Sequence, residues 1–168
     1  MKVFQITNIK DFMNKLLCSE LFDHFLLSEA FIQTKVAYTI DGRLTKEFWT
    51  KEELETEGLS DLPYAPFSQL RGSCYDLIKG KKTPVAFKFV FLLSPDNLAN
   101  TLARSDSSFS PEDLSGVFLN LKYADGKLSC TTGISYKAFS LDKSFEQYWD
   151  KLAAKFLSAH GIDFEELA

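Results

Sequence analysis

The chain has 168 residues, a formal net charge of −4 and an isoelectric point near 5.2. Apolar residues make up 45% and charged residues 25%, which excludes disordered and collagen-like chains and fits one domain covering residues 1–168. No long run of one charge sign occurs, so nucleic acid is disfavoured as a partner. Sixteen phenylalanines spread along the chain predict a large aromatic core.

Residues 1–6 lack the charged and apolar pattern of a leader, and no apolar run approaches the roughly 18 residues that span a bilayer. We therefore expect a cytoplasmic location without membrane contact. Cys18, Cys74 and Cys130 are far apart and in no CxxC arrangement, which predicts neither a disulfide framework nor a metal site. All three fall on apolar faces, so we interpret them as buried core thiols. We also expect no cofactor.

The first half begins with a predicted strand at 1–6 and an amphipathic helix from Ile9, capped by Thr7 or Asn8. Residues 25–40 have strand character. Asp41-Gly42 is then typical of a tight hairpin turn that returns the chain along a second strand at 44–49.

Capping-box spacing of Thr50 and Glu53 predicts a short polar helix before Gly58, and 59–66 reads as irregular. An amphipathic helix follows from Phe67 to Gly80. Gly72 inside it is interpreted as permitting close backbone packing.

The second half begins with a buried strand at 84–93, followed by a helix that Ser94-Pro95 starts. Ser110-Pro111 starts a single turn. Asp125-Gly126 predicts a hairpin between strands at 117–123 and 128–136. A long helix from about Asp142 and an acidic tail at 163–166 complete the chain.

Residues 1–80 and 84–161 therefore share one predicted order, namely strand, helix, hairpin and helix. The predicted fold class is α+β, with one or two antiparallel sheets from the two hairpin units and amphipathic helices packed on one face. An internal pseudo-twofold relating these half-repeats is an open alternative to coincidence among common elements.

The N-terminal quarter resembles a bacterial family described as a domain of unknown function. The residues that carry the resemblance are Ile6, Ile9-Lys10-Asp11-Phe12-Met13, Leu16-Leu17, Phe22-Asp23, Phe25-Leu26-Leu27, Glu29-Ala30 and Thr39-Ile40-Asp41-Gly42. Because that family has no assigned activity, the resemblance implies no site. Separately, tandem halves of this kind are similar in topology to DNA sliding-clamp domains.

Only His24 and His160 could act as acid-base groups near neutral pH. His24 could be oriented by Asp23 or Glu29, although a surface histidine is the stronger interpretation. His160 precedes Gly161 and can complement the dipole of the last helix.

Two surfaces offer weak binding candidates. Arg71 on its helix could hold an anion, with Ser73 and Tyr75 nearby. A polar platform would line the sheet face opposite the core; a plain solvated face is the stronger interpretation, and a binding surface is the alternative. The platform residues are Gln33, Lys35, Asn120, Lys122, Ser129, Thr131 and Ser135.

The sequence contains no nucleophile motif, phosphate loop or carboxylate pair that fixes a reaction. The leading hypothesis is a non-enzymatic module that binds a protein partner. The alternatives are a small enzyme with an acid-base site at His24, or a clamp-like nucleic-acid accessory protein. The oligomeric state stays open.

Overall fold

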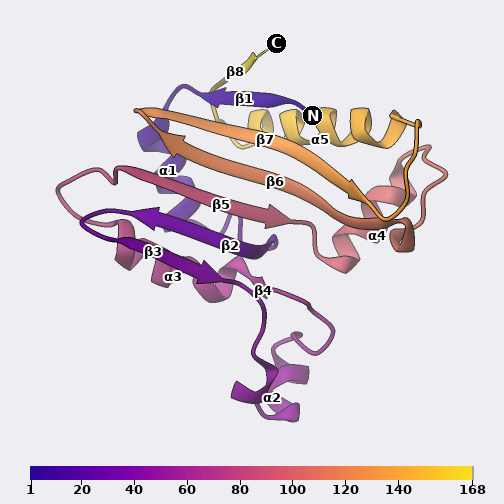
Figure 1. Cartoon of the computed structure of the whole chain (residues 1–168), viewed down its shortest axis with the longest axis horizontal. Helices are drawn as coiled ribbons and strands as arrows, with labels where there is room; N and C mark the ends of the chain where they lie inside the picture. The colour runs from indigo at the N-terminus through magenta and orange to yellow at the C-terminus, as the bar shows by residue number, and fades with distance from the viewer. Residues whose placement is uncertain (168) are drawn as a thin grey trace.

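The computed structural model describes residues 1–167 and contains one antiparallel sheet (Figure 1). Seven strands follow one another in the order β3-β2-β5-β6-β7-β1-β8, and the two-residue β4 pairs with β2 beside that path. Their bounds are β1 Val3–Ile6, β2 Leu26–Gln33, β3 Ala37–Asp41, β4 Ala65–Pro66, β5 Ala86–Leu92, β6 Leu114–Ala124, β7 Lys127–Tyr136 and β8 Phe164–Leu167.

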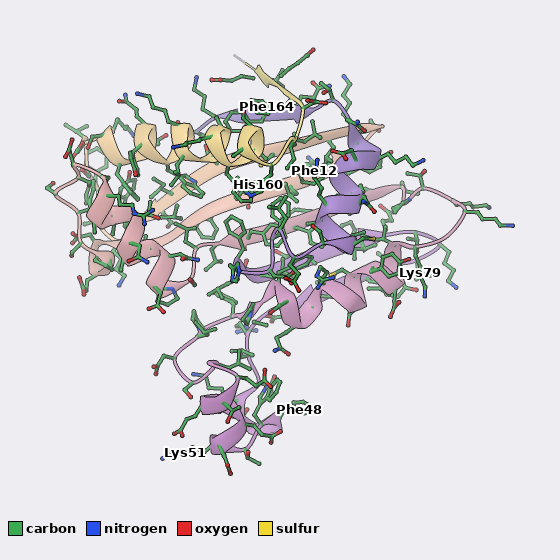
Figure 2. The ribbon with its side chains drawn as sticks, turned by 180° about the vertical axis from the view of Figure 1, so that it is seen from behind. Phe12, Phe48, Lys51, Lys79, His160 and Phe164 are labelled. Atoms are coloured by element: carbon green, nitrogen blue, oxygen red, sulfur yellow. The ribbon has the colours of Figure 1, made fainter. Side chains whose placement is uncertain are left out.

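Four helices cover one face of this sheet and leave the other face open (Figures 1 and 2). They are α1 Ile9–Cys18, α3 Phe67–Ile78, α4 Pro95–Arg104 and α5 Ser144–Ala159. The predicted α+β class, with an antiparallel sheet and helices on one face, is confirmed. Within residues 1–167, no helix combines the length and the apolar character that crossing a membrane requires.

Aromatic rings fill the interface between the sheet and the helices. The fully buried Phe22, just before β2, has its ring centroid 5.6 Å from Phe12 of α1 and 5.6 Å from Phe156 of α5. It also stacks at 5.5 Å on Phe91 of β5. One ring thus joins two helices to the centre of the sheet, which confirms a core built on phenylalanine.

The hairpin at Asp125-Gly126 is confirmed. These two residues have φ angles of 53° and 74°, the pair of positive values that a type I′ turn requires. They connect β6 and β7 in register, with Asn120 opposite Thr131 and Lys122 opposite Ser129.

The prediction of a hairpin turn at Asp41-Gly42 is wrong. The chain turns earlier, between β2 and β3, where the Thr34 amide donates to the Val36 carbonyl at 2.9 Å. Gly42 has another role, since a Cβ atom there would lie 1.7 Å from the Leu27 carbonyl oxygen. Its missing side chain therefore permits a close backbone approach. Residues 44–49 contain a 3₁₀ turn, η1 (Lys46–Phe48), and no strand.

Three further expectations change. The acidic tail at 163–166 contributes to β8, which pairs with β1. Gly72 has nothing within 4 Å of a built Cβ atom, so the expected close packing there is wrong. The strand order does not support the internal repeat, because β5 lies beside β6 whereas β1 lies beside β7.

The two glycines give a matched stability test. Gly42→Ala is expected to lower the free energy of unfolding by about 2 kcal/mol or more, because the new methyl group overlaps the Leu27 carbonyl. Gly72→Ala, in an open helical position, is expected to raise it by about 0.5–1 kcal/mol. Urea denaturation of both variants measures the difference, and equal effects would contradict the close approach at Gly42.

Candidate functional site

An excursion of the chain leaves β3 and returns to the sheet at β4. We call residues 43–64 the arm; it contains η1 and the helix α2 (Lys51–Thr56) and projects beyond the sheet (Figure 1). Its base is closed by a bridge between Arg43 and Tyr64 and by the Ala65 amide, which donates to the Gly42 carbonyl at 2.8 Å. The two ends of the arm are therefore fixed side by side.

Local hydrogen bonds hold the arm in shape. The predicted capping box is confirmed, with the Glu53 amide donating to Thr50 Oγ1 at 3.1 Å and the Thr50 amide to Glu53 Oε1 at 3.0 Å. These bonds, the backbone one first, lower the pKa of Glu53. Neither η1 nor α2 has a buried residue, and Leu59 is the buried side chain of the arm. The arm is ordered without a core of its own.

The arm presents an aromatic pair to solvent. Phe48 is 80% exposed on the arm (Figure 2). Its ring meets the Trp49 ring edge to face, with 5.4 Å between the centroids. Six carboxylates and three cations lie along residues 43–64, so the arm has a net charge of −3 in a chain whose net charge is −4. Sequence reasoning missed this surface because it assigned 44–49 to a strand.

A second feature, the groove between α4 and α5, has a volume of about 450 Å³. Apolar side chains form most of its lining, among them Phe25, Leu93, Leu119, Leu152 and Phe156. Polar side chains join them from both helices: Asn97, Asn100, Thr101, Arg104, Tyr148 and Lys155. Among residues 1–167, no carboxylate lines the groove.

Two polar groups in the lining are satisfied within the protein. The Thr101 hydroxyl donates to the Asn97 carbonyl at 2.7 Å, and the Trp149 indole N–H donates to the Phe118 carbonyl at 3.0 Å. Neither group needs a ligand as a partner. The buried part of the groove therefore behaves as an apolar surface.

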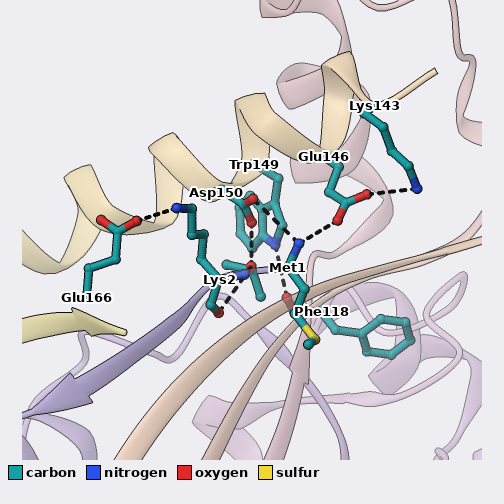
Figure 3. Close-up of polar contacts among 9 residues, drawn as sticks. Met1, Lys2, Phe118, Lys143, Glu146, Trp149, Asp150 and Glu166 are labelled. Atoms are coloured by element: carbon teal, nitrogen blue, oxygen red, sulfur yellow. Dashed lines mark hydrogen bonds and ion pairs between the residues drawn. The ribbon is translucent and has the colours of Figure 1, made fainter. Parts of the chain in front are cut away.

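Polar contacts with β1 and β7 fix the rotation of α5 (Figure 3). The Thr132 hydroxyl accepts from the Lys2 amide at 2.8 Å and donates to Asp150 of α5. The amino group of Met1 pairs with Glu146, and this hydrogen bond lowers the pKa of that carboxyl. These acidic side chains of α5 face the sheet edge, while Tyr148 and Lys155 line the groove.

Asp23, one of the two carboxylates expected to orient His24 in an acid-base site, is bonded to another side chain. Asp23 is buried and accepts two hydrogen bonds from Arg71, at 2.9 and 3.2 Å. His24 is exposed and lies outside the groove lining. The same ion pair occupies Arg71, the predicted anion candidate, and raises the pKa of its guanidinium.

The remaining candidates lie apart from one another. Lys122 is on the open face of the sheet, opposite Ser129, as the polar platform predicts. Lys35 lies instead in the turn between β2 and β3, and it shares a surface hollow with the lysines at 79, 81 and 82. His160 ends α5, where its Nδ1 is 2.8 Å from the Phe156 carbonyl. Among residues 1–167, no group of three or more metal-binding side chains is found.

The cysteines differ in accessibility. Cys74 and Cys130 are buried, but Cys18, the last residue of α1, is exposed, so its assignment to the core is wrong. Burial raises the pKa of Cys74 to about 12 and raises that of Cys130 as well. Both buried thiols therefore stay protonated and unreactive near neutral pH.

We expect one thiol of the native protein to react with an aromatic disulfide reagent at pH 8, and all three to react after denaturation. Absorbance of the released thiolate gives the count. Cys18→Ser is expected to abolish the native reaction. Fast labelling of the Cys18→Ser protein would contradict the burial of the other two cysteines.

Comparisons with known proteins identify the family. A family model described as "Family of unknown function (DUF5721)" matches residues 15–165, a much longer stretch than the N-terminal quarter that carried the resemblance. No curated protein and no solved structure matches the chain significantly. Since the family model covers most of the sequence, the chain belongs to the DUF5721 family of unknown function.

Proposed function

We propose that this protein is a non-enzymatic interaction module that binds a protein partner through its arm. The observation that carries the proposal is Phe48, which is 80% exposed on a segment whose helices bury none of their residues. An ordered segment of this kind contributes little to the core, and its exposed aromatic side chain is available for contacts outside the chain.

Phe48 and Trp49 suit the role of interface anchors. Aromatic side chains are enriched among the residues that dominate binding energy, because they bury a large area with few rotatable bonds. The base of the arm is tied to the sheet at Gly42 and Ala65, so the aromatic pair is presented with a restricted orientation. This preorganisation lowers the entropic cost of association.

The negative charge of the arm indicates what kind of protein surface would bind it. Six carboxylates accompany the aromatic pair, and Arg43 is paired with Asp41, with 2.7 Å between Nη2 and Oδ2. A complementary protein surface has an apolar pocket for Phe48 surrounded by lysine or arginine side chains. Association with such a surface is expected to weaken as the salt concentration rises.

The catalytic alternative gains no support from the geometry. Asp23 is bonded to Arg71 and is therefore not free to orient His24. Glu29, the other carboxylate considered, is 3.9 Å from Lys88 on the open face of the sheet.

The test begins with a photo-crosslinking amino acid at position 48, which identifies the partner in cells. The partner is then purified, and its affinity is measured by calorimetry. Phe48→Ala is expected to weaken binding roughly thirtyfold, equivalent to about 2 kcal/mol for an interface anchor. Its unfolding free energy is expected to change by less than about 0.5 kcal/mol, because the side chain is exposed.

Phe139 provides the matched control, because it is 89% exposed in the segment between β7 and α5. Phe139→Ala is expected to leave the affinity unchanged. Equal affinities for the wild type and Phe48→Ala would contradict the proposal, as would a loss of binding of the same size in Phe139→Ala.

A further inference from the structure

We propose that the groove between α4 and α5 binds a small amphipathic carboxylate, a molecule with one anionic head and an apolar tail. The proposal does not depend on the function of the arm. It follows from the size of the groove, the chemistry of its lining and the distribution of charge around it.

The lining is positively charged in a chain that is negative overall. The sequence has 23 acidic and 19 basic residues, yet in the described part of the chain Arg104 and Lys155 line the groove and no carboxylate does. Within residues 1–167, neither cation forms a salt bridge. The guanidinium of Arg104 on α4 and the ammonium of Lys155 on α5 are therefore both available to an anion in the groove.

These two cations differ in how they bind a carboxylate. Arg104 can form two parallel hydrogen bonds with its planar guanidinium, whereas Lys155 acts as a mobile point charge. Exposed Asn97 and Asn100 add uncharged donors on the α4 side. An anionic head thus finds hydrogen-bond donors without a competing negative charge in the lining.

The buried part of the groove suits a hydrocarbon tail. The polar groups of Trp149 and Thr101 are hydrogen-bonded within the protein. The remaining lining is apolar surface, from the buried Leu119 and Ala153 and the half-buried Leu152 and Phe156. Removing this surface from water favours an apolar occupant. A buried polar tail would find few partners here.

The volume favours a small molecule over a helix. A pocket of about 450 Å³ is in the range of sites for small organic ligands. A bound α-helix with its side chains has a diameter of about 10–12 Å. A volume of about 450 Å³ therefore holds roughly one turn of such a helix. We therefore assign the groove to a small ligand, and an acidic amphipathic peptide becomes the competing outcome of the test.

Dodecanoate is a suitable probe, with dodecanol as its uncharged analogue. Titration of the full chain, followed by Trp149 fluorescence in a Trp49→Phe background, is expected to give saturable dodecanoate binding below the concentration at which the probe forms micelles. The double variant Arg104→Ala/Lys155→Ala is expected to lose about tenfold or more in dodecanoate affinity. Its dodecanol affinity is expected to stay at the wild-type level.

Two further variants separate binding from folding. Ala159→Trp adds bulk at an exposed position of the lining and is expected to block both probes while the melting temperature stays unchanged. Lys151→Ala removes an exposed cation of α5 outside the lining and is expected to bind dodecanoate like the wild type.

Absence of saturable dodecanoate binding would overturn the assignment. So would a double variant that binds dodecanoate like the wild type, or an acidic amphipathic peptide that binds through Arg104 when dodecanoate does not. None of these results bears on the arm, because Phe48 and Arg104 lie on separate elements.

Discussion

The rest of the structure depends on one constraint, the burial of a phenylalanine cluster between the helices and a single face of the sheet. Phe22 contacts rings from α1, α5 and β5 at once, so the helices have to lie on the same face of the sheet. The opposite face is left to half-buried and polar residues such as Asn120 and Thr131. Interiors tolerate few voids, and a cluster of rigid rings fixes the spacing of the elements around it.

Both candidate sites lie where this aromatic core ends. The arm leaves the sheet at Gly42 and adds Leu59 as its buried side chain, so its aromatic pair stays in water. The groove lies between α4 and α5 on the covered face of the sheet, and Leu119 of β6 contributes to its lining. In the arm, the side chains that would contact a partner are therefore separate from the core, whereas the groove shares Leu119 and Phe156 with it.

The sequence predicted the elements better than their arrangement. Asp125-Gly126 adopts the positive φ angles of a hairpin, whereas Asp41-Gly42 has the same letters but uses glycine for a close contact with Leu27, which is distant in sequence. The alternation of apolar residues identified β6 and β7, but the acidic residues of β8 carry no such pattern. The groove could not be predicted at all, since its shape depends on side chains from α4, α5, β6 and the ends of two loops, whose packing no local spacing describes.

The position of β1 has a consequence for biosynthesis. This strand pairs with β7 and β8, so residues 3–6 find their hydrogen-bond partners only in the last third of the chain. During translation, β1 therefore emerges from the ribosome long before the strands that complete its side of the sheet. Pairing over such a sequence separation slows folding and delays closure of the sheet until β7 and β8 have been synthesised.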